Sequence, residues 1–243
     1  MEFIASGTEA DIYRKGNKVI KLFKEIFPKN IVEYEANLQI MASEYGLPVP
    51  EIFDIIEING RNAIIMEFLD GISLGEKIKN EENGKDKYIK KSIEIQININ
   101  DIRTTKFPLM KNKLKDQISN TEKLNNLEKN KILEKLDMAT FEDNLCHCDL
   151  HLGNLIETSN GIKIIDWLSA SSGSPYAEVC RTYLLYKMHG IELSELYLET
   201  YCKLMKIDKA KILIWTPIVA GARLSEGINN EIKELLEIIR SNL

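Results

Sequence analysis

The sequence predicts an α+β protein with a small β-rich N-terminal part that holds one helix, followed by a larger, mainly helical part. Three observations carry this prediction. Short alternating apolar segments dominate the first 70 residues. Apolar residues at helical spacing follow to the end of the chain, and one hairpin-like segment, Leu145–Trp167, interrupts them. The length of 243 residues suits two such parts, because domains average about 150 residues.

Three strands are predicted at the start of the chain. Phe3–Ala5 and Ala10–Tyr13 are short strand-like segments, and Ser6–Glu9 joins them. Lys18–Phe23 alternates between polar and apolar residues, which is the period of a half-buried strand. A turn at Arg14–Asn17 separates the second strand from the third.

A helix and a second hairpin complete the β-rich part. The helix follows Pro28 and ends near Gly46, because apolar residues recur at spacings of three and four: Ile31, Tyr34, Leu38 and Met41. Glu51–Glu57 and Arg61–Phe68 then flank Asn59-Gly60, the dipeptide typical of a tight hairpin turn.

The remaining chain is predicted to be helical. Residues 80–91 are charged and indicate an exposed loop or a helix junction, and helices fill most of the segment from 89 to 136. Thr158–Gly161 is the turn of the inserted hairpin, and residues 178–243 are helical with a break near Pro217. We therefore divide the chain at the connector near Glu67–Gly71, into residues 1–69 and 70–243.

Composition excludes several classes of protein. A hydrophobic share of 44% and a charged share of 28% are typical of globular proteins. The net charge of -5 argues against general nucleic-acid binding, which needs a cationic surface. No segment reaches the 18 or so apolar residues of a membrane helix, and the N-terminus has no secretory pattern. With four scattered cysteines as reduced thiols, we expect a cytoplasmic protein with no nucleic-acid or membrane partner.

One segment has the residue types and spacing of a phosphoryl-transfer site. His147-Cys148-Asp149 is followed after four residues by Asn154, and Asp166 comes twelve residues later at the end of an apolar strand. This order is typical of a kinase catalytic loop and its metal-binding acid. A carboxylate is needed near the acceptor hydroxyl, and Mg²⁺ prefers oxygen ligands. We therefore predict Asp149 as the catalytic residue, and Asn154 and Asp166 as metal ligands.

Two other interpretations of this segment stay open at the level of sequence. A zinc site could use the thiols and imidazoles of Cys146, His147, Cys148 and His151. Strand alternation argues against it, because the two thiols would point away from His147. The second alternative is a strand–loop–strand whose acids have no function. It is disfavoured because unpaired carboxylates are costly to bury.

The segment also resembles a known family. His147–Asn154 is similar to the His-Gly-Asp-Leu-His-x-x-Asn loop of the aminoglycoside phosphotransferase and choline kinase superfamily, with Cys148 in place of Gly. Ile165-Asp166-Trp167 resembles the metal-binding motif of that family. The segment Gly173–Leu184 resembles its Gly-x-Pro-x-x-Asp-x-Ala-Arg motif, with Glu178 in place of Asp. The resemblance implies a bilobal, protein-kinase-like fold that spans nearly the whole chain.

The resemblance assigns roles in the N-terminal lobe as well. Gly7 and Thr8 lie in the loop that would cover the phosphates of ATP, although only one glycine is present there. Lys21 on the third strand would contact the α- and β-phosphates. Its helix partner would be Glu35, with Glu33 as the alternative. The connector would bind adenine through Met66, Glu67 and Leu69.

These roles predict an ATP-dependent phosphotransferase, with Mg²⁺-ATP between the lobes. The enzyme would transfer the γ-phosphate to a hydroxyl of a small molecule. The alternative is a pseudokinase that binds nucleotide or a partner without transfer. A protein kinase is disfavoured, because the segment between Asp166 and Glu178 is too short for an activation loop. A P-loop ATPase is disfavoured because the Gly-x-x-x-x-Gly-Lys motif is missing. The short chain suggests a small or shallowly bound acceptor, whose identity the sequence does not give.

Overall fold

The computed structural model describes residues 1–7, 9–81 and 84–243. They form two compact units: Met1–Glu82 with Leu152–Ser169, and Asn83–His151 with Ala170–Leu243. The predicted division into a nucleotide-binding lobe of residues 1–69 and an acceptor lobe of residues 70–243 concerns function and stays a prediction.

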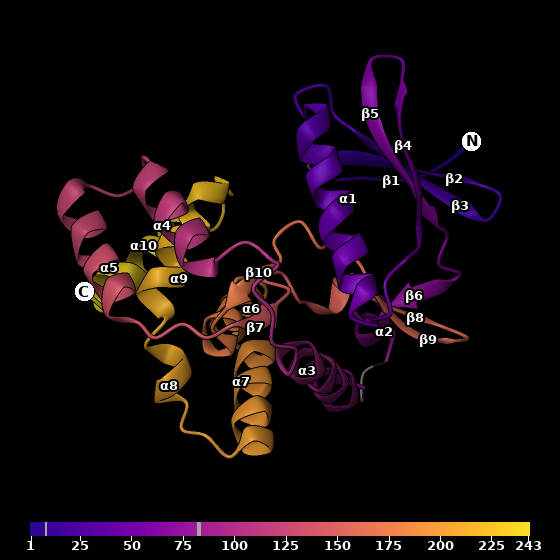
Figure 1. Ribbon diagram of the computed structural model, residues 1–243. Coiled ribbons are helices and arrows are strands. Elements are labelled where there is room, and N and C mark those ends of the chain that lie inside the picture. Colours follow the sequence, from indigo (N-terminus) through magenta and orange to yellow (C-terminus); the bar gives the residue numbers. More distant parts are fainter. Residues whose placement is uncertain (8, 82–83) are drawn as a thin grey trace. The chain divides into compact units, whose positions relative to one another are not determined.

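The first unit is built on a five-stranded antiparallel sheet (Figure 1). Its strand order is β1-β2-β3-β5-β4, so β3 lies between its hairpin partner β2 and β5, which comes later in the chain. The strands are β1 (Glu2–Ser6), β2 (Ala10–Lys15), β3 (Lys18–Phe23), β4 (Ile52–Ile58) and β5 (Arg61–Glu67).

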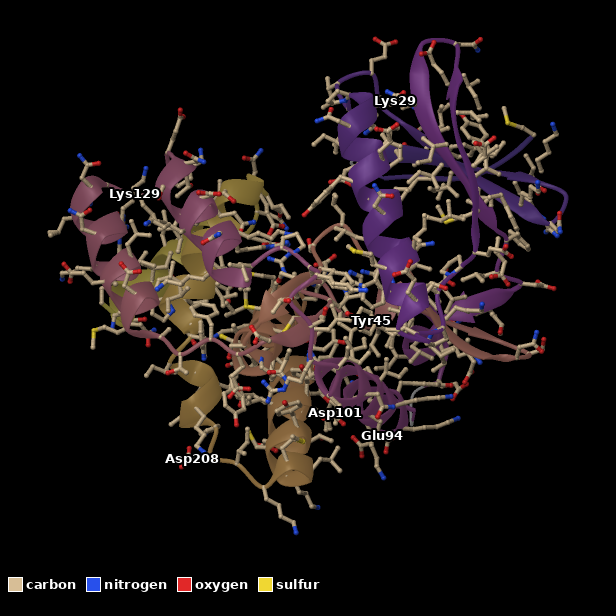
Figure 2. All side chains as sticks on the ribbon, in the orientation of Figure 1. Lys29, Tyr45, Glu94, Asp101, Lys129 and Asp208 are labelled. Carbon is tan, nitrogen blue, oxygen red and sulfur yellow. The ribbon has the colours of Figure 1, made fainter. Side chains whose placement is uncertain are left out.

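Helix α1 (Lys29–Glu44) connects β3 to β4 and covers one face of this sheet (Figure 1). Figure 2 marks its beginning at Lys29 and the residue just beyond its end at Tyr45. The alternation of β3 and β5 sends every second side chain towards the helix. A small core results, formed by the apolar side chains Ala10, Phe23, Val32, Ala36 and Ile64. This packing places α1 against β4 and β5.

The turn between β4 and β5 has the predicted geometry. Asn59 and Gly60 both have positive φ, at 51° and 78°. Two consecutive residues in this region form the turn whose twist matches an antiparallel hairpin, which is why Asn-Gly is favoured there. The predicted hairpin is therefore confirmed.

A second, three-stranded sheet belongs to the same unit. Its order is β6-β8-β9, where β6 (Gly71–Ser73) comes from the end of the connector, while β8 (Leu155–Thr158) and β9 (Gly161–Ile164) form the inserted hairpin. The pairing requires glycine at position 71, because a Cβ there would lie 2.4 Å from the carbonyl oxygen of Glu157. Helix α2 (Leu74–Asn80) follows β6 directly and is capped by the Ser73 hydroxyl.

The second unit is mainly helical and contains one two-stranded ribbon. The ribbon pairs β7 (Asn144–Cys146) with β10 (Ser171–Gly173). Helix α3 (Lys85–Asn100) packs against α7 (Ile191–Met205), and α6 (Pro175–Lys187) packs against the same helix. A hydrogen bond from Tyr197 to Gln96 joins α7 to α3 in the buried interior.

Three more helices of this unit pack around α9 (Thr216–Arg223). They are α4 (Met110–Asn120), α5 (Asn126–Met138) and α10 (Ile232–Ser241), with a 3₁₀ turn η2 at Leu224–Glu226, whereas the short helix α8 (Ala210–Leu213) packs against α6. Gly221 of α9 lies close to the side chains of Ile118 and Ile132, so α4 and α5 approach α9 closely. Pro217 stands in the first turn of α9, where a proline is tolerated, and this explains the predicted break.

Most predicted elements are present, and three short ones were not predicted. β6, α2 and β10 span only 3, 7 and 3 residues, which is too short for a periodic pattern to be read from the sequence. Within the described residues, no helix has both the length and the apolar composition of a membrane span.

Candidate active site

The side chain of Lys21 is the centre of a buried charge cluster in the first unit. Its Nζ donates to Glu35 Oε1 over 2.5 Å and lies 3.7 Å from Asp166 Oδ1. Burial disfavours the Lys21 ammonium, but the carboxylates of Asp166 and Glu35 outweigh this effect and raise the pKa of the lysine above its usual value. Lys21 is therefore held as a cation.

Glu35, and not Glu33, is the partner of Lys21 on α1. The Glu35 side chain is 4% exposed, whereas Glu33 is exposed and pairs with Lys29 one turn earlier in the helix. Burial raises the pKa of Glu35 despite the nearby lysine. The predicted pairing is present, and its role towards a nucleotide stays a prediction.

Asn154 and Asp166 lie at the open end of the β8–β9 hairpin. Leu155 and Ile164 are paired in the ladder, and one step beyond them the amide of Ile165 donates to the carbonyl of Asn154 over 3.0 Å. Asp166 has a φ of 67°, a left-handed conformation that turns the chain out of the hairpin. Its side chain is 41% exposed, in contrast to the buried Glu35.

The donor chemistry at this hairpin end fits a Mg²⁺ ion. One carboxylate and one amide oxygen are hard ligands, and Mg²⁺ is commonly held by one or two protein groups together with water and phosphate oxygens. Asp166 and Asn154 would hold the ion, and the ion would neutralise phosphate charge. By contrast, no group of three or more Cys, His, Asp or Glu side chains in the described part of the chain is arranged to hold a metal. The zinc alternative therefore has no support in the structure.

The segment predicted to bind adenine, Met66–Leu69, is held in place by contacts of Glu67. The Glu67 carboxylate accepts from Lys163 Nζ over 3.1 Å, and the Glu67 amide donates to the carbonyl of Glu51 over 2.8 Å. Since this amide is already used, an adenine contact by Glu67 would need its carbonyl oxygen. The Glu67 pair with Lys163 also fixes the connector to β9.

Gly7 is the predicted site residue of the phosphate-covering loop that the structure describes. The amide of Gly7 donates to the carbonyl of Ala10 over 2.8 Å, and the carbonyl of Gly7 accepts from Lys24 Nζ over 2.8 Å. Both backbone groups of Gly7 are therefore already hydrogen-bonded, one to Ala10 and the other to the Lys24 side chain beyond β3. Thr8 lies outside the described residues.

Asp149 belongs to the second unit and is paired with an arginine. Arg181 Nη2 lies 3.1 Å from Asp149 Oδ1, and His151 Nε2 lies 3.8 Å from Asp149 Oδ2. Burial alone would raise the pKa of Asp149, but the charges of Arg181, His151 and His147 outweigh it and hold the pKa below its usual value. Asp149 is therefore an ionised, half-buried carboxylate.

The loop before Asp149 is anchored by the buried carboxylate of Glu178. Its Oε1 accepts from the amide of Cys148 over 2.8 Å, and its Oε2 accepts from Asn100 Nδ2 over 2.6 Å. Cys148 has a φ of 62°, and its Sγ lies 3.0 Å from Ser171 Oγ. The left-handed backbone explains why glycine is usual here, since only glycine adopts this conformation without cost. The Glu178 anchor holds a cysteine in that conformation.

Sequence reasoning did not predict the partners of Asp149. Arg181 falls in a motif that the sequence shares with a family, but spacing gives no contact between it and a residue 32 positions earlier. The pattern showed only that a basic residue follows Glu178 by three positions. A long-range ion pair of this kind depends on tertiary packing, and no local periodicity reports it.

A cavity of about 870 Å³ also lies within the second unit. Its lining is mostly apolar and includes Ile97, Tyr201 and Trp215, and none of the predicted site residues contributes to it. Volume alone would favour it as a ligand site. The charged residues predicted for phosphoryl transfer do not line it, so volume alone does not make it the candidate active site.

Comparison with known proteins gives the family. The model of the phosphotransferase enzyme family matches residues 1–213. Among proteins with curated descriptions, none matches the sequence.

Solved structures of the same fold are distant in sequence. Choline kinase LicA from Streptococcus pneumoniae has a TM-score of 0.67 at 15% identity, over 99% of this chain and 93% of its own. A thermostable mutant of aminoglycoside phosphotransferase APH(4)-Ia, solved with ADP and hygromycin B, has a TM-score of 0.70 at 13% identity, over 98% and 92%. A choline/ethanolamine kinase family protein from Mesorhizobium loti has a TM-score of 0.62 at 13% identity, over 98% and 83%.

These likenesses confirm the predicted α+β, protein-kinase-like fold, with its N-terminal antiparallel sheet and helical C-terminal part. Together with the family match over most of its length, they identify this chain as a member of the phosphotransferase enzyme family, related in fold to choline kinases and aminoglycoside phosphotransferases.

Proposed function

We propose that this protein is an ATP-dependent kinase that transfers the γ-phosphate to a hydroxyl of a small molecule. The observation that carries the proposal is the cluster around Lys21, a buried cation held between Glu35 and Asp166. A cation fixed beside a metal-binding carboxylate suits the binding of nucleotide phosphates. Solved relatives in fold carry ADP, AMP or AMP-PNP, which supports the choice of an adenine nucleotide.

Each proposed residue has a separate task in the transfer. Lys21 binds phosphate oxygens, and Glu35 keeps its ammonium in place. Asp166 and Asn154 hold Mg²⁺, which supplies charge neutralisation when bound. Met66, Glu67 and Leu69 line the adenine, and the loop of Gly7 and Thr8 covers the phosphates.

Asp149 acts on the acceptor. Its ionised carboxylate accepts the proton of the acceptor hydroxyl as the hydroxyl oxygen attacks the γ-phosphorus. The bond from the γ-phosphorus to the bridging oxygen of ADP breaks, so the products are ADP, a phosphate ester and one proton. The low pKa of Asp149 keeps it in the form that can accept a proton at neutral pH.

The test is an ATP-consumption screen over amino alcohols, amino sugars, sugars and nucleosides. Choline, ethanolamine and hygromycin B belong in the panel, since solved relatives carry these names in their descriptions. We expect at least one class to be phosphorylated. Asp149→Asn should lower turnover by about 10² to 10⁴ fold. ATP affinity should stay within a few fold, because Asp149 has no role in nucleotide binding.

The same proteins and acceptor panel distinguish a kinase from a pseudokinase. Thermal stabilisation by Mg²⁺-ATP with no phosphate transfer to any acceptor would favour binding without catalysis. Transfer that is unchanged in Asp149→Asn would contradict the mechanism and leave the family assignment intact. We also expect a cytoplasmic location, where the four cysteines would stay as the free thiols seen in the structure.

A further inference from the structure

The Asp149 carboxylate stands at the end of a line of alternating charges in the second unit. Arg181 donates to Asp149 Oδ1 over 3.1 Å through Nη2 and to Glu226 Oε1 over 2.7 Å through Nη1. Arg223 pairs with Glu226, and donates to both carboxylate oxygens of Glu231 over 2.8 Å each. We call these five residues, Asp149, Arg181, Glu226, Arg223 and Glu231, the ion chain.

The ion chain joins the loop of Asp149 to four other elements of the second unit. Asp149 lies in the loop after β7, Arg181 is in α6, and Glu226 is in η2. Arg223 is the last residue of α9, and Glu231 directly precedes α10. The C-terminal helices thus reach the loop of Asp149 through side chains, without any backbone contact between them being needed.

Stability does not explain this arrangement. The side chains of Arg181, Arg223 and Glu231 are 15%, 11% and 5% exposed. Desolvation of such ions offsets most of the attraction between them, and apolar residues of similar size often stabilise a fold equally well. Arg181 moreover has an Nε that is buried without a hydrogen-bond partner among the described residues, which is a further cost. A functional role of Arg181 beside Asp149 accounts better for the buried arginine.

The charges that face Asp149 and its partner can be stated element by element. His147 and His151 come from the loop of Asp149 itself, and Arg181 comes from α6. Around Arg181 lie Glu226 of η2 and Lys113 of α4, and Cys148 and Glu178 complete the surroundings. Arg181 donates a hydrogen bond to Asp149 and, unlike the two histidines, is a permanent cation.

We propose that Arg181 is a positioning residue for the transfer, which keeps Asp149 ionised and fixes one of its oxygens, while Glu226 and the Arg223–Glu231 pair fix Arg181. This inference rests on the proposed function in that it takes Asp149 as the group that accepts the proton.

Removing Arg181 and removing its second partner, Glu226, should have different effects on the acid limb of the pH profile. Removing the cation in Arg181→Met leaves a half-buried carboxylate without its main counter-charge, so the acid limb of kcat/KM moves to higher pH by about one unit or more. Removing the anion in Glu226→Gln takes away the second carboxylate that pairs with Arg181, so the arginine interacts more strongly with Asp149. The acid limb then stays or moves to lower pH, while turnover falls several fold because Arg181 is less well fixed.

The experiment compares these variants with Arg181→Lys and with a matched control. Arg181→Lys keeps the charge and loses the second hydrogen-bonding arm, so we expect the wild-type acid limb with a turnover reduced by about tenfold. Arg240→Met removes an arginine that pairs with Glu128 in the same unit, outside the ion chain, and should leave the profile unchanged. KM for ATP should change by less than a few fold in all four variants.

A readout that needs no acceptor separates this inference from the proposed function. In protein labelled with ¹³C at aspartate Cγ, the Asp149 resonance is assigned by its loss in Asp149→Asn and titrated in each variant. An upward shift of its titration in Arg181→Met, with no acceptor ever phosphorylated, would show that Arg181 controls the ionisation of Asp149, but it would overturn the proposed function and with it the role of Arg181 in the transfer. A titration identical to wild type in both Arg181→Met and Glu226→Gln would overturn the inference. If Arg181→Met does not fold, Arg181→Lys and Glu226→Gln carry the test.

Discussion

Lys21 Nζ lies 2.5 Å from Glu35 Oε1, and the carboxylate side chain of this pair is 4% exposed. Lys21→Met would leave Glu35 buried without its counter-charge. Loss of one partner of a buried pair costs on the order of 3 kcal/mol of stability. We therefore expect the free energy of unfolding in urea at pH 7 to fall by that amount, and ATP binding to weaken in the same variant.

A matched control and a double variant test the cause. Lys15→Met removes an exposed lysine from the neighbouring strand β2 and should change stability by less than about 0.5 kcal/mol. Lys21→Met combined with Glu35→Gln should recover part of the lost stability, since no buried charge remains. A Lys21→Met variant as stable as Lys15→Met would contradict the buried pair.

The substitution Asp166→Asn tests the predicted metal site without disturbing the backbone. Its φ of 67° suits asparagine as well as aspartate, so Asp166→Asn should fold normally. The variant lacks the anionic ligand for Mg²⁺. We expect stabilisation by Mg²⁺-ATP, seen as a rise in Tm, to be reduced strongly, and EDTA should have the same effect on the wild type.

The control for this experiment is Asp54→Asn, which changes an exposed aspartate of β4 in the same unit. It should respond to Mg²⁺-ATP as the wild type does. Full stabilisation of Asp166→Asn by Mg²⁺-ATP would show that Asp166 does not hold the metal.

Glu178 predicts an unusual dependence of stability on pH. Burial raises its pKa from 4.5 to about 7, even though its carboxylate accepts hydrogen bonds from Asn100 and from the amide of Cys148. Between pH 4.5 and 7 the unfolded chain has released a proton that the folded chain still holds. The contribution of Glu178 to stability therefore falls as pH rises through this window, by about 3 kcal/mol in total, and the loss is complete above pH 7.

Glu178→Gln should remove this dependence. The amide oxygen of glutamine can accept from Cys148, and Asn100, whose Oδ1 has no hydrogen-bond partner in the described residues, can turn to accept from the new amide group. Urea unfolding at pH 5, 6, 7 and 8 should show wild type losing stability relative to Glu178→Gln as pH rises. Glu199→Gln, an exposed change on α7, serves as the control, and parallel curves for all three proteins would refute the prediction.

Gly71 is expected to tolerate no side chain. A Cβ at this position would lie 2.4 Å from the Glu157 carbonyl oxygen, which belongs to the backbone and cannot rotate away. Gly71→Ala should destabilise the protein by about 1 to 3 kcal/mol. Gly7→Ala is the control for stability, because its Cβ would meet the nearest atom at an ordinary 3.6 Å. Equal unfolding free energies for the two variants would show that β6 and β8 are not paired as described.

The fold was predictable where local patterns are strong. The strands of the first sheet, the helix carrying Glu35 and the Asn59-Gly60 turn each have a period or a turn residue that dictates the structure. Short elements such as β6 and β10 were missed, because three residues have no period and form only through pairing with distant strands.

The candidate site was predictable to a different degree. Spacing between Asp149, Asn154 and Asp166 indicated the kind of chemistry, because the residue types suit a metal and a hydroxyl. The pairing of Lys21 with Glu35 over Glu33 followed from a family spacing and is present in the structure. The contacts of Arg181 with Asp149 and Glu226, and the second hydrogen bond of Glu178 to Asn100, could not be predicted, since each joins residues 30 or more positions apart through side chains alone.

The membership of the β8–β9 hairpin in the first unit has a consequence for how such a protein can diversify. Every described residue proposed to contact the nucleotide or its metal belongs to that unit, whereas Asp149 and the ion chain belong to the other. Under the proposed function, recognition of the phosphate donor and handling of the acceptor thus belong to separate units. The proposal then predicts that substitutions which alter the acceptor can accumulate in the helical unit while the donor site stays intact, so that one nucleotide-binding module can serve many acceptors.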